Sequence, residues 1–158
     1  MKFFLIIIAL SILISSISLA QTTDTHLTRG QEYSARGDSL RAEGQYMLAI
    51  ESDPQSAEAH ARLGEIYAKR KNYKKAVQSF ENALSLGYKD PLFFTRFAFS
   101  LKMSGDLDGA VRVYQVFVAN HPDLPGAHLG LGGLYDEIGM KDKGEEEYGL
   151  YRELRNIK

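Results

Sequence analysis

The chain has 158 residues, and its 44% hydrophobic and 25% charged content is ordinary for a soluble globular protein of about one domain. Its net charge of −1 argues against a nucleic-acid binder, because such proteins carry a strong basic excess. The absence of cysteine excludes disulfides, thiolate metal sites, a cysteine nucleophile and a lipid-modified N-terminal cysteine.

Residues 1–20 have the pattern of a secretory signal peptide. Lys2 supplies a positive charge, an almost unbroken apolar run extends from Phe3 to Ile14, and the small–x–small pattern of a cleavage site ends at Ala20. We therefore expect cleavage after Ala20 and a periplasmic or secreted protein. The absence of cysteine favours a bacterial periplasm, because small secreted eukaryotic domains commonly rely on disulfides. The alternative is an uncleaved membrane anchor, since Phe3–Ala20 approaches the minimum length that spans a bilayer.

From residue 23 onwards the sequence repeats every 34 residues without a gap. The four rows cover residues 23–56, 57–90, 91–124 and 125–158. The eighth column holds a small residue in every row: Gly30, Gly64, Ala98 and Gly132. The twenty-fourth column holds an aromatic residue in every row: Tyr46, Phe80, Tyr114 and Tyr148. Such columns indicate four copies of one structural repeat.

Each row predicts two amphipathic helices separated by a turn. Apolar and small residues recur three and four positions apart, which is the period of a helix and not of a strand. The middle of each row contains residues that end helices, such as Gly37 and Gly105. Asp90 before Pro91 is a favourable start for the third row. The sequence therefore predicts an all-α fold of eight helices, stacked as four hairpins.

The pattern resembles the tetratricopeptide repeat, a 34-residue helix–turn–helix unit with the signature W-x2-L-G-x2-Y, then A-x3-F, then P. The second row carries this signature most clearly, as Leu63-Gly64, Tyr67, Ala76 and Phe80. The opening tryptophan of the signature is replaced in all four rows, by His26, His60, Phe94 and His128. The resemblance covers residues 23–158 and implies an α-solenoid whose polar last helix caps the array itself.

The sequence indicates no catalytic, cofactor or metal site. It contains no nucleophile elbow, zinc-protease motif or phosphate loop. Gly130, Gly132 and Gly133 lie in a predicted helix with no strand before it, so they indicate a weakened helix and not a nucleotide loop. Column-mates on successive hairpins are roughly 10 Å apart, so the histidine column cannot share one metal ion.

The resemblance implies that the first helix of each repeat lines a concave groove. The half of the groove that rows three and four form is apolar, with Leu92, Phe99, Met103 and Leu129. The half that rows one and two form is more polar. Apolar side chains rimmed by charge suit a docked helix or an extended peptide. The predicted partner-binding residues are Leu92, Thr95, Phe99, Lys102, Met103, Leu129, Gly133, Asp136, Glu58 and Glu65.

These observations predict a non-catalytic protein–protein interaction scaffold or adaptor that is exported to the cell envelope. The expected partner is another polypeptide, with no nucleic acid and no cofactor. A membrane is expected as a partner only if the signal segment is retained, and self-association through the groove remains open. Two alternatives remain for the function: a membrane-tethered adaptor that keeps residues 1–20, and an accessory subunit of an envelope enzyme that holds a peptide or glycan.

Overall fold

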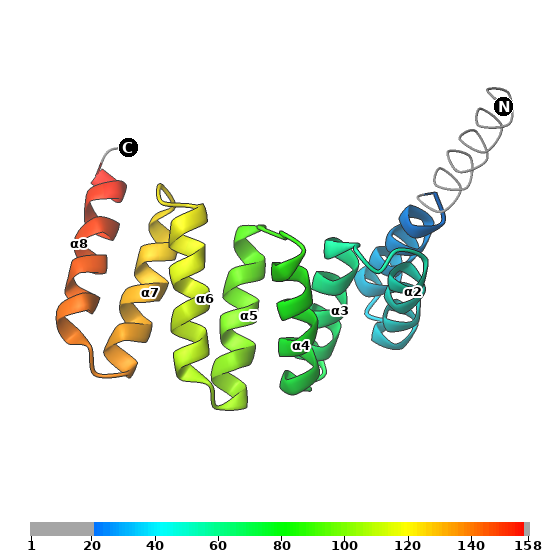
Figure 1. Ribbon diagram of the computed structural model, residues 1–158, viewed down its shortest axis with the longest axis horizontal. Coiled ribbons are helices and arrows are strands. Elements are labelled where there is room, and N and C mark those ends of the chain that lie inside the picture. Colours follow the sequence, from blue (N-terminus) through cyan, green and yellow to red (C-terminus); the bar gives the residue numbers. More distant parts are fainter. Residues whose placement is uncertain (1–20, 157–158) are drawn as a thin grey trace, which may run out of the picture.

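The computed structural model describes residues 21–156, and these residues form helices and turns without any strand. A first helical stretch covers residues 21–35, and the helices that follow are α2 (Ser39–Ser52), α3 (Ala57–Lys69), α4 (Tyr73–Ser85), α5 (Pro91–Ser104), α6 (Leu107–Asn120), α7 (Pro125–Glu137) and α8 (Lys141–Asn156). Figure 1 shows them side by side in chain order. The predicted all-α class is confirmed over these residues.

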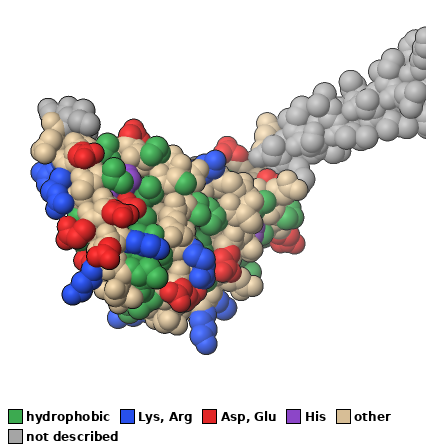
Figure 2. Space-filling model, turned by 60° about the vertical axis from the view of Figure 1, so that its left-hand side comes forward, with side chains coloured by type: hydrophobic (Ala, Val, Ile, Leu, Met, Phe, Trp, Pro, Cys, Tyr) green, Lys and Arg blue, Asp and Glu red, His purple; other side chains and the backbone are tan. Residues whose placement is uncertain are grey.

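No helix in this part of the chain is both long and apolar enough to cross a membrane. The predicted signal segment, residues 1–20, lies outside the described residues. On the face shown in Figure 2, hydrophobic side chains lie in patches between acidic and basic ones.

The turn inside each hairpin has the same construction. Its fifteenth-column residue has a positive φ in every row: Gly37 (78°), Lys71 (60°), Gly105 (93°) and Gly139 (81°). The next residue caps the second helix in three rows. Asp38 accepts from the Arg41 amide at 3.1 Å, and Asn72 and Asp106 make the equivalent bonds at 3.3 and 2.7 Å. A capping side chain satisfies an amide that the helix leaves without a partner, so these residues fix where each second helix begins.

The eighth-column glycines lie directly against aromatic rings of the second helix. A Cβ at Gly64 would lie 2.6 Å from the Phe80 ring, and Gly30 and Gly132 are similarly close to Tyr46 and Tyr148. Glycine in the eighth column therefore makes room for the aromatic ring of the twenty-fourth column.

The third hairpin departs from this pairing. Its eighth-column residue is Ala98, and Tyr114 lies against Gly130 of the next hairpin, where a Cβ would be 2.2 Å away. The methyl group of Ala98 occupies space that glycine leaves open in the other rows.

The buried core divides into two clusters. The larger one runs from α3 through α7 and contains five buried phenylalanines: Phe80, Phe93, Phe94, Phe97 and Phe117. The smaller one joins the first hairpin to α3 through four buried residues: Ala42, Tyr46, Leu63 and Ile66. Tyr67 is partly buried and packs against both clusters. The first hairpin is therefore attached to the rest by a smaller apolar contact.

Candidate functional site

Four apolar side chains of α5 and α7 are exposed and form what we call the groove cluster. Leu92, Phe99 and Met103 of α5 are 60%, 53% and 49% exposed, and Leu129 of α7 is 45% exposed. They occupy columns two, nine, thirteen and five of their rows, which belong to one face of the first helices. Phe99 also meets the edge of the Tyr73 ring, with centroids 6.0 Å apart. Large apolar groups gathered on a surface are typical of an interface.

A hollow of about 300 Å³ lies beside this cluster, between α3 and α5. Thr95 and Phe99 of α5 line it together with Glu65 of α3, and Lys69 and Arg96 add positive charge. The Thr95 hydroxyl donates to the Leu92 carbonyl at 2.8 Å, so it is already satisfied within the helix. The hollow offers an incoming side chain the Phe99 ring and the Lys69 ammonium, whereas Arg96 is paired with Glu65.

The two predicted acidic residues of α3 are engaged in a network that links three hairpins. Glu58 accepts from Gln31 and from Arg62, both at 3.1 Å, and Glu65 accepts from Arg62 at 3.4 Å and also from Arg96. The Glu65 side chain is only 15% exposed. Burial alone would lower the pKa of Arg62, but Glu65 and the other nearby groups raise it above its ordinary value. This polar part of the face holds neighbouring hairpins together.

The remaining predicted residues also make contacts within the chain. Lys102 forms an ion pair with Glu137 of α7. The Tyr148 hydroxyl donates to Asp136 at 2.7 Å, and this hydrogen bond raises the pKa of Tyr148. A Cβ at Gly133 would lie 3.9 Å from the same hydroxyl. Asp136 therefore ties α7 to α8, and the groove cluster holds the predicted residues that are most free to meet a partner.

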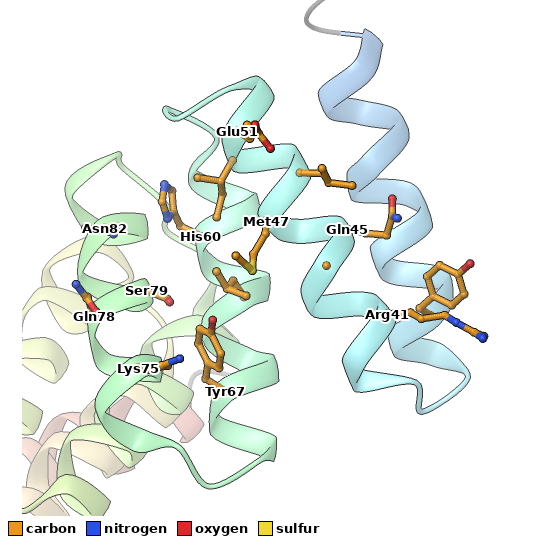
Figure 3. A pocket seen from close by; sticks show the side chains of 15 residues that line it. Arg41, Gln45, Met47, Glu51, His60, Tyr67, Lys75, Gln78, Ser79 and Asn82 are labelled. Carbon is orange, nitrogen blue, oxygen red and sulfur yellow. The ribbon is translucent and has the colours of Figure 1, made fainter.

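A larger cleft lies on the other side of the hairpins, between α2 and α4 and above α3 (Figure 3). We call it the α2–α4 cleft, and the whole cavity to which it belongs has a volume of about 940 Å³. Its large apolar lining residues are Met47, Leu48, Ile50, Leu63 and Tyr67, and its polar lining from α4 is Lys75, Gln78, Ser79 and Asn82. The cavity continues around α2 toward Tyr33 and Gln45. Burial and a hydrogen bond with Glu43 raise the pKa of Tyr67 above its ordinary value.

This cleft was not predicted, because the predicted site residues were chosen only from the columns that face the groove. A signal was present in the fourth and seventh columns. Row two has His60 and Leu63 where row three has the larger Phe94 and Phe97. The corresponding space between α4 and α6, which Phe97 lines, has a volume of only about 220 Å³.

Two of the column-four histidines are bound to the loop that precedes their helix. His60 Nε2 lies 3.1 Å from the Pro54 carbonyl, and His128 Nε2 lies 2.9 Å from the Pro122 carbonyl. His128 Nδ1 is also 2.7 Å from a Glu147 carboxylate oxygen. The column therefore connects successive hairpins. Within residues 21–156, no group of three or more His, Cys, Asp or Glu side chains is arranged to hold a metal ion.

Comparison with known proteins identifies the same repeat. Profiles of the tetratricopeptide repeat match residues 27–91 and 95–124. The human Protein O-mannosyl-transferase TMTC1 is 30% identical over 116 residues, which cover 70% of this chain and 13% of that protein. The general transcriptional corepressor trfA of Dictyostelium discoideum is 25% identical over 122 residues, which cover 76% of this chain and 9% of that protein. The chain thus spans only a small part of these relatives.

Solved structures share the fold at lower identity. MamA superimposes with a TM-score of 0.77 at 20% identity, over 85% of this chain and 79% of the other. YrrB, described as a TPR protein with an unusual peptide-binding site, superimposes with a TM-score of 0.73 at 23% identity, over 82% of this chain and 66% of the other. These similarities support the α-solenoid fold of stacked hairpins.

Proposed function

Because this chain belongs to the tetratricopeptide repeat family, we propose that it is a non-catalytic scaffold that binds another polypeptide on its first-helix face. The observation that carries the proposal is the groove cluster, Leu92, Phe99, Met103 and Leu129, whose side chains are about half exposed. Burying such side chains against a partner is favourable by roughly 25 cal/mol per Å² of apolar surface. The peptide-binding site named for YrrB supports this use of the fold.

The surroundings of the cluster define what the partner should carry. Its apolar side chains would cover Phe99 and Leu92, and an acidic group would meet Lys69 at the hollow between α3 and α5. Arg96 at the same hollow is already paired with Glu65, so it contributes less to binding an acidic group. The partner is therefore a helix or extended segment with two or more apolar anchors and an acidic flank.

The test is to capture partners from the envelope fraction of the native cells, and then to measure the affinity of each captured polypeptide for variants. We expect Leu92→Asp/Phe99→Asp to weaken binding at least about tenfold, because buried aromatic and aliphatic anchors dominate interface energy. Leu40→Asp is the matched control, since Leu40 is 73% exposed and lies on α2, away from the cluster. Equal affinity of both variants, with unchanged helicity by circular dichroism, would show that the groove cluster is not the binding site.

We further propose that the scaffold works in the periplasm or outside the cell after removal of residues 1–20. The charged start, the apolar run and the small residues before Gln21 support this proposal. Mass spectrometry of the protein from its native host tests it. A mature N-terminus at Gln21 is the expected result, whereas a retained Met1–Ala20 segment would favour the membrane-tethered adaptor.

A further inference from the structure

The α2–α4 cleft and the space between α4 and α6 are lined by corresponding columns of successive rows. Between the next pair of second helices, α4 and α6, phenylalanines of α5 fill most of the space and leave about 220 Å³. Between α2 and α4, where row two has the smaller His60 and Leu63, a cavity of about 940 Å³ stays open, part of which continues around α2 to Tyr33 and Gln45. This volume lies at the upper end of the range of roughly 300–1,000 Å³ that binding pockets occupy. The exposed Met47 on its rim has the flexible side chain that adaptable binding surfaces use.

The two sides of the cleft differ in chemistry. The α2 wall and the α3 floor present apolar groups, chiefly Met47, Leu63 and Tyr67. The α4 wall presents the amides of Gln78 and Asn82, which lie one helical turn apart. Neither amide side chain makes a hydrogen bond elsewhere in residues 21–156. Each amide can both donate and accept, so the pair offers partners to peptide backbone groups.

This asymmetry favours an extended peptide over a helix. A helix satisfies its backbone groups internally, so its main chain offers the exposed amides of Gln78 and Asn82 no hydrogen bond in place of water. An extended segment leaves N–H and C=O groups free and points alternate side chains to opposite sides. One side of such a segment can face the amides while its apolar side chains enter the space above Leu63.

Charge sets the direction of the peptide. Lys75 and Glu51 lie toward opposite ends of the cleft (Figure 3). The Lys75 ammonium lies 5.3 Å from the centre of the Tyr67 ring, and within the described residues neither Lys75 nor Glu51 forms an ion pair. An unpaired cation at one end of an apolar cleft complements a carboxylate.

We propose that the α2–α4 cleft is a second docking site, which binds an extended peptide with apolar side chains at alternate positions and a carboxylate at the end that meets Lys75. This site is separate from the groove cluster, because its residues come from the first two hairpins and none belongs to α5 or α7. It would give the scaffold two binding surfaces, on opposite sides of the hairpins.

The experiment uses the chain expressed from its complete coding sequence and a pool of fluorescein-labelled heptapeptides. The peptides carry Leu, Ile, Val or Phe at alternate positions, Thr or Ser between them, and Glu at a free C-terminus. Fluorescence anisotropy is expected to show saturable binding, at least about tenfold tighter than for the same pool with Gln and a C-terminal amide. A second pool, with its apolar residues three and four positions apart, represents a helical occupant and is expected to bind more weakly.

Variants assign the binding to the cleft. Leu63→Phe copies the residue of row three and fills the space, Met47→Asp adds a charge to the exposed rim, and Lys75→Glu reverses the end charge. Each is expected to weaken binding of the acidic pool about tenfold or more, whereas Leu40→Asp should have no effect. Met47→Asp keeps the test valid if Leu63→Phe unfolds, because Met47 is exposed.

The results also separate this site from the first-helix face. Leu92→Asp/Phe99→Asp should bind the pool as the wild type does, so failure of the groove proposal would leave this one standing. Absence of saturable binding up to about 1 mM, or binding that Met47→Asp leaves unchanged, would overturn the proposal. Tighter binding of the helical pool would replace the extended occupant with a helix, and self-association lost in Met47→Asp by sedimentation would replace it with a second copy of the chain.

Discussion

At the scale of single residues, the eighth-column glycines have no room for a side chain beside the aromatic rings of the second helices. We expect Gly64→Ala to destabilise the protein by about 1–3 kcal/mol, because the added methyl group would lie 2.6 Å from the Phe80 ring and must displace it. Urea unfolding followed by circular dichroism measures this difference.

Gly149→Ala is the control for Gly64→Ala. Gly149 is helical, and a Cβ there would meet no atom within 4 Å outside its own helical turn and chain neighbours. Alanine is better than glycine in an open helical position, so this variant should gain up to about 1 kcal/mol. If both variants lost stability, the glycines would be required by the backbone conformation and not by contact with the aromatic rings.

Lys71 is the one described non-glycine residue with a positive φ, at 60°. The left-handed conformation costs an L-residue roughly 1–2 kcal/mol, and the other three hairpins have glycine at this column. We expect Lys71→Gly to stabilise the protein by up to about 1 kcal/mol, after the larger unfolded-state entropy of glycine is subtracted. Thermal and urea unfolding measure the gain.

The comparison variant is Lys74→Gly. Lys74 lies in the first turn of α4, so glycine there should cost about 0.5–1 kcal/mol. If Lys71→Gly also lost stability, the turn of the second hairpin would not be strained.

For the column-four histidines, the sequence predicted the position in the repeat but not the hydrogen-bond partners. Their shared column predicted that they replace an aromatic residue. The sequence also holds Pro54 and Pro122 six positions before His60 and His128. Only the structure shows that the proline carbonyls bind the imidazoles, because this contact depends on the path of the loop between hairpins. Row three has neither the histidine nor the proline. Its column-four residue, Phe94, is buried among the other phenylalanines of the larger cluster.

At the scale of elements, α7 shows that a run of glycines can have two different causes. The sequence indicated only a weakened helix. In the structure a Cβ at Gly130 would lie 2.2 Å from the Tyr114 ring, and one at Gly132 would lie 2.6 Å from the Tyr148 ring. At Gly133 the nearest atom is 3.9 Å away, an ordinary contact. Two of these three glycines are therefore required by packing.

This difference predicts opposite effects of one substitution at adjacent positions. Gly133→Ala should stabilise the protein by about 0.5–1 kcal/mol through helix propensity. Gly132→Ala should cost about 1–3 kcal/mol, because Tyr148 must move. Denaturant midpoints of the two variants, measured side by side, test the prediction. Equal shifts in the same direction would contradict the packing of α7 against α8.

Helix boundaries were the most predictable feature of the elements. The turn glycines and the capping Asp38, Asn72 and Asp106 are local signals, and each acts within a few residues of itself. The exposed apolar residues of α5 were predictable for the same reason, since a column places a residue on one face of its own helix. Which charged residues on that face are already paired was not predictable. Glu65 meets Arg96 across 31 positions of sequence.

At the scale of the whole molecule, the α2–α4 cleft could not be predicted from any single row. Its volume depends on the summed sizes of side chains from four helices, and each of them is an acceptable residue for its own column. The 34-residue period predicts that hairpins stack, but it does not say how well each interface is filled. Here the cavity at the first interface is larger than the one between α4 and α6, and the core is divided into two clusters at the same place.

An array of repeats is stabilised by each repeat and by the interfaces between neighbours, so a poorly filled interface should act as a weak link. We predict that the first hairpin, residues 21–35 and α2, opens at a lower free energy than the rest. Native-state hydrogen exchange with mass spectrometry should show its amides exchanging faster than those of α3 to α6. The other terminal hairpin separates this effect from ordinary fraying, because α7 contributes Ala127, Leu131, Leu134 and Tyr135 to the larger cluster. Faster exchange in α7 than in α2 would contradict the prediction. If exchange is faster in α2, and a peptide bound in the α2–α4 cleft slows it, then binding in the cleft couples the first hairpin to the rest of the array.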